Sequence, residues 1–160
     1  MLALVESYPQ KRCFPRPPNT NNNSYRVHPN TLINSSAFVK YFTREEGWER
    51  VREAMLEGIV TLDLAVKELA NTLWKKVMRN EMSLDTARAV LRDIIDEKAI
   101  PVKGQDKYIA KAFNIAVEHG ITVYDALFIV LAKESSLEFI ISDKVQADVA
   151  SKLGVKTMII

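Results

Sequence analysis

Three acidic residues stand beside apolar segments, where a charge without a partner is costly. Asp125 lies within the apolar run 121–132, Glu68 comes one helical turn after Leu64, and Asp143 comes just after the apolar segment 139–141. Removing a carboxylate from water without a partner costs free energy, and a divalent cation bound by several carboxylates offsets that cost. The three acids therefore predict a metal site if the fold brings them together.

Each acid also has a simpler interpretation, which stays open at this point. Asp125 near a helix start is favoured by the helix dipole, and Asp143 is a good N-cap residue. Glu68 has Lys67 and Lys75 as candidate salt-bridge partners. All three acids, however, are predicted to lie near the starts of helices that follow one edge of a sheet.

The residue types restrict the chemistry of such a site. Carboxylate oxygens suit Mg²⁺ or Mn²⁺, and a metal held by carboxylates typically activates a water for attack on phosphorus. The histidines and cysteine are His28, His119 and Cys13, so neither a zinc site nor a Ser/His/Asp triad is expected. With five glycines and no glycine-rich phosphate loop, a nucleoside-triphosphate site is not expected either.

The elements that must position these residues alternate between strands and helices. We expect strands at 31–33, 59–62, 100–102, 138–141 and 155–159, and helices at 37–42, 48–55, 64–80, 83–95, 105–119, 121–132 and 143–153. This alternation is typical of an α/β fold with a mostly parallel central sheet that helices cover on both faces. Ligands of such sheets bind beyond the carboxyl ends of the strands, where Asn34, Asp63 and Asp143 are expected.

Cap residues are predicted from the same pattern. Ser35 or Ser36 is expected to cap the helix after the first strand, and Asp63 is expected to cap the long helix after the second. Gly120 is expected to end the helix that precedes the apolar run 121–132.

Length and composition indicate one ordinary soluble domain. The chain has 160 residues, 48% hydrophobic residues and a net charge of +2, so its overall charge gives no sign of nucleic-acid binding. No apolar run has membrane-spanning length, and a single cysteine fits a reducing compartment. We therefore expect a cytoplasmic protein without a membrane partner.

Residues 1–29 differ from the rest of the chain. They are rich in proline and asparagine, carry several basic residues and lack a periodic apolar face. We expect an irregular N-terminal tail before a globular domain at 30–160. Deletion of residues 1–28 is expected to leave thermal stability nearly unchanged.

Four segments resemble the PIN domain, and most closely its VapC toxin branch. They are Ile33–Phe42, Glu68–Lys75, Val123–Ala132 and Ser142–Asp143, and the resemblance covers roughly residues 31–160. It implies a three-layer α/β/α endoribonuclease that depends on Mg²⁺ or Mn²⁺, with a VapB-like antitoxin as partner and a homodimer as the usual assembly. It also implies that Glu68, Asp125 and Asp143 are catalytic acids that hold the metal.

Two positions depart from the family pattern. Asn34 stands where the family has its first Asp, and Ile141 stands where a Thr is frequent. An amide oxygen is a weaker metal ligand than a carboxylate, so Asn34 is expected to contribute weakly. Replacing Asn34 with Asp is therefore expected to raise metal-dependent cleavage roughly tenfold or more.

RNA contacts and self-association are predicted from two further sets of residues. Basic side chains that would track an RNA backbone are Lys75, Lys76, Arg79, Lys40 and Lys144, although the first three also suit a helix C-terminus. The helices carry more large apolar side chains than their inner faces require, which predicts a dimer. These residues are Phe38, Tyr41, Phe42, Trp48, Leu73, Trp74 and Met78.

Three functions compete on this sequence. The first is a metal-dependent ribonuclease toxin, and the second is a PIN-fold binding module that cleaves poorly because of Asn34. The third, an aspartyl-phosphate phosphatase, would need Asp-x-Asp after the first strand, and residues 34–36 are Asn-Ser-Ser.

Overall fold

The computed structural model describes residues 14, 29–96 and 99–160. Within this part of the chain, a parallel sheet of five strands has the order β3-β2-β1-β4-β5. The strands are β1 (Thr31–Ile33), β2 (Ile59–Leu62), β3 (Val102–Lys103), β4 (Glu138–Ile141) and β5 (Thr157–Ile159). β1, β2 and β4 are almost entirely buried, as expected for the inner strands of a sheet covered on both faces.

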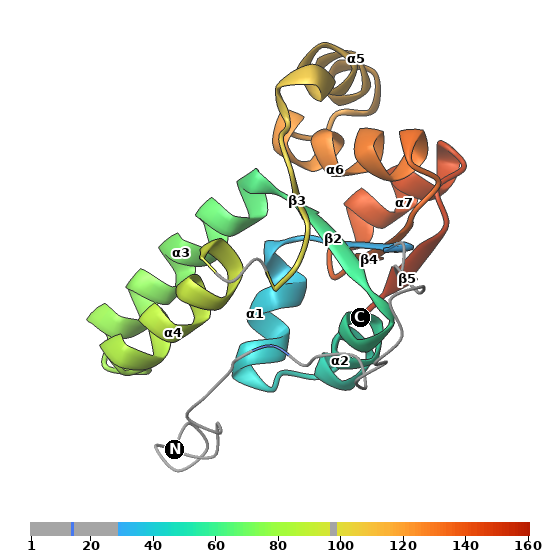
Figure 1. The fold of residues 1–160 in the computed structure, drawn as a ribbon. Coiled ribbons are helices and arrows are strands. Elements are labelled where there is room, and N and C mark those ends of the chain that lie inside the picture. Colours follow the sequence, from blue (N-terminus) through green and yellow to red (C-terminus); the bar gives the residue numbers. More distant parts are fainter. Residues whose placement is uncertain (1–13, 15–28, 97–98) are drawn as a thin grey trace.

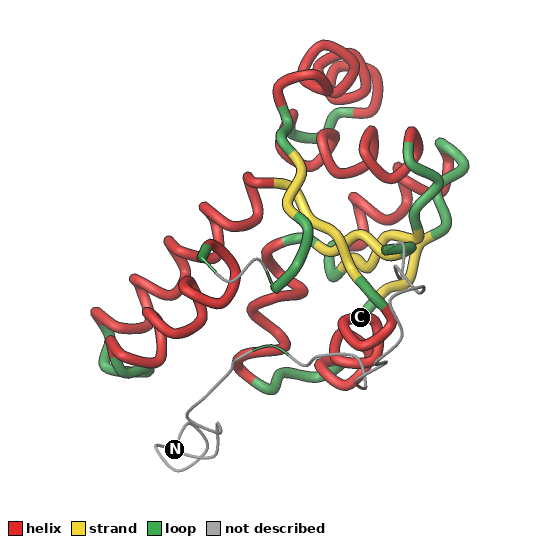
Figure 2. The backbone as a smooth tube through the Cα atoms, viewed as in Figure 1, coloured by secondary structure: helices red, strands yellow, loops and turns green. Residues whose placement is uncertain are grey.

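Seven α-helices of the described residues surround this sheet (Figures 1 and 2). They are α1 (Ser35–Thr43), α2 (Trp48–Glu57), α3 (Asp63–Met78), α4 (Leu84–Ile95), α5 (Ile109–His119), α6 (Val123–Glu134) and α7 (Lys144–Lys152). α1 and α2 lie on one side of the sheet and α5 and α6 on the other, while α3 and α4 pack side by side and project away from it (Figure 1). The predicted three-layer α/β/α fold is confirmed.

The sheet has a topological switch point between β1 and β4. From β1 the chain moves outward through β2 to β3, and it then returns to β4 on the other side of β1 and moves on to β5. In sheets of this kind, crossovers that run in opposite directions place helices on opposite faces, and ligands bind beyond the carboxyl ends of the strands at such a point. Asn34 follows β1 and Asp143 follows β4, so the sequence places two polar side chains at this point.

The apolar run 121–132 forms the expected buried helix. Thr122 caps α6, and every residue from Ala126 to Ala132 is buried. Phe128 stacks on Phe139 of β4 with ring centroids 5.8 Å apart, which fixes α6 against the sheet. The position of Asp125 in the first turn of α6 follows from this packing.

Two predicted caps are wrong. Asn34, and not Ser35 or Ser36, caps α1, because its side-chain oxygen accepts a hydrogen bond from the Ala37 N–H at 3.1 Å. Asp63 is already inside the first turn of α3, where Leu62 is the N-cap residue and makes no side-chain cap bond. The carboxylate of Asp63 instead pairs with Lys67 at 3.0 Å, the salt bridge expected for residues four apart on a helix.

Most predicted boundaries shift by one to three residues, and three of these shifts have a local cause. β3 begins at Val102 because Pro101 has no N–H, although the Pro101 carbonyl still accepts from the N–H of Thr61. The segment expected as one helix from 105 divides into a 3₁₀ turn (Asp106–Tyr108) and α5, which ends at Gly120 in the left-handed conformation. β5 begins two residues late because the Val155 N–H still bonds the Ala150 carbonyl at the end of α7.

One residue of the predicted tail packs on the domain. Phe14 is 7% exposed and meets Phe38 and Phe42 of α1 edge to face, with ring centroids 6.2 Å and 5.3 Å away. The rest of the predicted tail before residue 29 lies outside the described residues. Phe14 therefore belongs to the hydrophobic core, although the sequence assigned it to an irregular tail.

The apolar residues that predicted a dimer belong mostly to the core. Phe38, Tyr41, Phe42 and Leu73 are buried, and Trp48 packs against the core, whereas Trp74 and Met78 are exposed. A second exposed apolar set lies on α5, at Ile109, Phe113 and Val117.

No single helix of the described residues is both long and apolar enough to cross a membrane. The segments Asp106–His119 and Val123–Glu134 satisfy that criterion only as a pair bent by 115°.

Candidate active site

The side-chain amide of Asn34 accepts hydrogen bonds on one end and donates one from the other. Its Oδ1 accepts from the Ala37 N–H at 3.1 Å and from the Ser36 hydroxyl at 3.0 Å, and its Nδ2 donates to Gln146 Oε1 at 3.4 Å. The backbone N–H can only donate, so the capping bond fixes which end of the amide faces α1. Asn34 is 6% exposed, and both hydrogen bonds to its oxygen come from its own helix.

Gln146 joins the starts of three helices. It is 2% exposed, in the first turn of α7. Its Nε2 donates to the backbone carbonyl of Asp125 in α6 at 3.0 Å, and its Oε1 accepts from Asn34 at the start of α1. The N-termini of α1, α6 and α7 therefore meet beyond β1 and β4, and their partial positive charges favour anions there.

Asp125 and Asp143 both have structural roles at these helix starts. Asp143 Oδ1 accepts from the Gln146 N–H at 2.7 Å and so caps α7. Asp125 Oδ2 accepts from the Thr122 hydroxyl at 2.7 Å, while Thr122 Oγ1 accepts from the Asp125 N–H, which forms a reciprocal capping pair. The simpler interpretations of both acids are thus confirmed, and among the described residues these hydrogen bonds use one oxygen of each carboxylate.

Glu68 approaches the same region from α3. Its Oε2 accepts from the Ser35 hydroxyl at 2.7 Å, and Ser35 is the first residue of α1 after Asn34. The salt bridge considered for Glu68 is not among the ion pairs of the described residues, and Lys67 pairs with Asp63 instead. Glu68, Asn34, Asp125 and Asp143 thus belong to one region at the switch point, linked through Ser35 and Gln146.

The acids are less enclosed than their apolar neighbours suggested. Asp143 is exposed, and Asp125 and Glu68 are half-buried, because each lies at a helix end or edge while the apolar residues face the core. The argument from a buried unpartnered charge is therefore wrong for Asp143 and holds only partly for the other two.

The donor set suits a magnesium or manganese ion by chemistry, and its present geometry does not close around one. Three carboxylates offer hard oxygen ligands. Among the described residues, however, no group of three or more Asp, Glu, His or Cys side chains is arranged so that it could hold a metal ion. Each carboxylate is turned toward a neutral donor of the protein, and Asn34 has its oxygen occupied by α1.

The basic residues predicted to contact RNA differ in their distance from the three acids. Lys144 is exposed and adjacent to Asp143, which makes it the predicted RNA contact nearest to the acids in sequence. Lys75 and Arg79 are exposed near the C-terminus of α3, and at 1.5 Å per residue they are roughly 10 to 16 Å along the helix from Glu68. They therefore lie toward the other end of α3 from Glu68.

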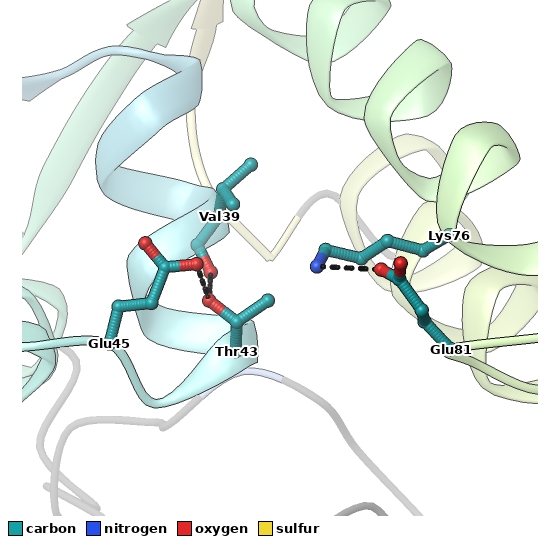
Figure 3. Close-up of polar contacts among 5 residues, drawn as sticks. All are labelled: Val39, Thr43, Glu45, Lys76 and Glu81. Carbon is teal, nitrogen blue, oxygen red and sulfur yellow. Dashed lines mark hydrogen bonds and ion pairs between the residues drawn. The ribbon is translucent and has the colours of Figure 1, made fainter. Parts of the chain in front are cut away.

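Two of the lysines predicted to contact RNA are already bonded to other residues of the protein. Lys76 pairs with Glu81 at 3.6 Å across the turn between α3 and α4, and its side chain is directed toward Thr43, at the end of α1, and Glu45, which follows that helix (Figure 3). Lys40 donates to the Glu46 carbonyl at 3.0 Å. Both partners are near solvent, so an RNA phosphate would compete with them.

Sequence reasoning did not identify three residues of this region: Gln146, Ser35 as the partner of Glu68, and Thr122. Gln146 bonds Asn34, which is 112 positions away, and Ser35 bonds Glu68, which is 33 positions away. No local sequence pattern indicates contacts over such separations. Thr122 had a recognisable signal, because a Thr three residues before an acid is a capping pair.

These features define a doubly wound α/β protein with an acidic site at its switch point. The PIN domain family model matches residues 31–152. The chain is also 32% identical over 120 residues to ribonuclease VapC3 of Pyrobaculum aerophilum, over 73% of this chain and 92% of that protein. The chain therefore belongs to the PIN domain family, in its VapC branch, as the sequence predicted.

Solved structures agree on the fold. The crystal structure of PAE2754 from Pyrobaculum aerophilum matches with a TM-score of 0.60 at 22% identity, over 88% of this chain and 92% of that chain. A toxin-antitoxin complex from Klebsiella pneumoniae matches with a TM-score of 0.50 at 14% identity, over 71% of this chain and 86% of that chain. At these identities the likeness bears on the fold alone.

Proposed function

We propose that the protein is a ribonuclease toxin of the VapC type, which hydrolyses phosphodiester bonds within RNA. The proposal is supported by the hydrogen bonds that link the starts of α1, α6 and α7 and bring Glu68 to the start of α1, in a chain related to ribonuclease VapC3. The helix N-termini of α1, α6 and α7 converge there and favour the phosphate of a substrate. Asp125 and Asp143 are thereby held on rigid helix starts.

We propose further that Glu68, Asp125 and Asp143 hold Mg²⁺ or Mn²⁺, with Asn34 as a weak ligand at most. When bound, such an ion would activate a water and neutralise charge on the phosphate. Glu68 and Asp125 would exchange the rotatable hydroxyls of Ser35 and Thr122 for the ion. Asp143 would keep its bond from the Gln146 N–H on Oδ1 and offer its other oxygen. Asn34 would have to break its cap on α1 to offer its oxygen.

Basic residues would guide the RNA chain past these acids. Lys144 beside Asp143 is proposed to contact the phosphate nearest the site. Lys75, Lys76, Arg79 and Lys40 are proposed to contact phosphates farther along the strand, because of their distance along α3 and α1.

We also propose a VapB-like antitoxin as partner, a homodimer as the assembly and the cytoplasm as the location. One structure with this fold is a toxin-antitoxin complex, which supports the antitoxin. Exposed apolar side chains on α5 and at the end of α3 support the homodimer. Light scattering should give twice the 18.1 kDa chain mass, and a monomer mass at tens of micromolar would contradict the homodimer.

A binding module with weak cleavage is the second candidate. It is favoured by Asn34, whose oxygen serves as a helix cap and carries no charge. Incubation of the protein with single-stranded RNA in Mn²⁺ and in EDTA separates the two. The ribonuclease proposal predicts cleavage that EDTA abolishes, whereas RNA binding without cleavage at any Mn²⁺ concentration would favour the binding module.

A further inference from the structure

Gln146 is buried between one acceptor and one donor. Its Nε2 faces the Asp125 backbone carbonyl at 3.0 Å and its Oε1 faces Asn34 Nδ2 at 3.4 Å, with the side chain 2% exposed. The backbone carbonyl can only accept a hydrogen bond, so it fixes the donor end of the Gln146 amide toward α6. The acceptor end must then face position 34.

Position 34 is constrained from its other side as well. The Ala37 N–H requires an acceptor at the start of α1, and Gln146 Oε1 requires a donor. Asparagine has both an acceptor and a donor in one short side chain, whereas an ionised aspartate has only acceptors. An aspartate there would place two acceptors face to face, and reversing the Gln146 amide would only move the conflict to the Asp125 carbonyl.

We propose that Gln146 is a positioning residue that holds the starts of α1, α6 and α7 together and requires a hydrogen-bond donor at position 34. Asn34 is then the matched partner of Gln146 and not simply an aspartate without its charge. The proposal concerns the site of the proposed ribonuclease, although the hydrogen-bonded bridge itself does not depend on that function. Gln146 is too buried to touch RNA, so it acts through Asp125 and Asn34.

A double-mutant cycle in EDTA tests the bridge. Asn34→Asp should lower the Tm by about 3 to 8 °C in the presence of Gln146, and by less than about 2 °C when added to Gln146→Met, which has no acceptor oxygen. As a control for charge, Asn114→Asp on the exposed surface of α5 should leave the Tm nearly unchanged. Asparagine and aspartate cap helices about equally well, so a simple cap role predicts no loss for Asn34→Asp.

An unchanged or raised Tm for Asn34→Asp overturns the proposal, and so do equal losses in the two backgrounds. If Gln146→Met does not fold, Gln146→Leu serves as the second background. The Tm of Asn34→Asp in the native background still tests the proposal, because an unchanged or raised value overturns it.

A kinetic measurement tests the positioning role. Gln146→Met should lower kcat for RNA cleavage about tenfold with KM unchanged, when both proteins are assayed well below their Tm. An unchanged kcat would overturn the positioning role. If the native protein cleaves no RNA, the proposed function fails while the stability cycle still tests the bridge.

Discussion

Ser35 donates its hydroxyl hydrogen to Glu68 Oε2 at 2.7 Å, which joins α1 to α3 across 33 residues of sequence. The contact aligns the Glu68 carboxylate with the helix start that carries Asn34. Because Glu68 has free rotation about its side-chain bonds, this hydroxyl is the group that fixes its orientation.

Ser35→Ala should therefore reduce activity more than stability. We expect a loss of about 1 kcal/mol in the free energy of unfolding and a roughly tenfold lower kcat, because the carboxylate loses its donor. Denaturant unfolding and RNA cleavage measure the two effects. Ser35→Thr retains the hydroxyl and should recover most of the activity; a variant that stays as slow as Ser35→Ala would contradict this role.

Asp143 offers a way to separate its helix cap from its proposed catalytic role. Asp143→Asn should keep the bond from the Gln146 N–H and hence the stability, because asparagine is an equally good cap. Its activity should fall about 100-fold or more, because the site loses a carboxylate. Asp143→Ala should lose the same activity and in addition about 1 kcal/mol of stability.

Full activity of Asp143→Asn would show that Asp143 is a cap alone. Thermal melts of both variants without metal provide the comparison of stability.

The order of the elements was predictable from the sequence, whereas the connections within the site were not. The alternation of apolar strands with amphipathic helices determined the layers, and the seven consecutive buried residues of α6 follow directly from the run 121–132. The exposure of Asp143 was not predictable from neighbours alone, because a strand end turns its next residues toward solvent. The Gln146 bridge depends on strand order, which brings residues 112 positions apart into contact.

Asn34→Asp should have opposite effects with and without metal. In EDTA it is expected to destabilise the protein, while in Mn²⁺ the added charge should tighten ion binding by about 1 to 3 kcal/mol and raise cleavage roughly tenfold. Calorimetric titration with Mn²⁺ and side-by-side cleavage assays measure these changes. Equal Mn²⁺ affinity of the two proteins would show that position 34 does not reach the ion.

Phe14 should contribute to stability although it precedes the family match. Phe14→Ala removes a ring that is 7% exposed, and we expect a loss of about 2 kcal/mol and a Tm lower by roughly 4 to 8 °C. Ile95→Ala on α4, where the side chain is 57% exposed, is the control and should change the Tm little. A Phe14→Ala protein as stable as the native one would instead agree with the expectation that residues 1–28 can be deleted with little change in thermal stability.

The most direct test of the proposed ribonuclease is the effect of Asp125→Asn on a circular single-stranded RNA, which has no ends for an exonuclease. Asp148→Asn, an exposed acid on α7, is the matched control, and both are compared with the native protein in Mn²⁺ and in EDTA. We expect the native protein and Asp148→Asn to linearise the circle in Mn²⁺ only, and Asp125→Asn to leave it intact. Cleavage by Asp125→Asn at the native rate, or native cleavage that persists in EDTA, would contradict a metal-dependent ribonuclease centred on Asp125.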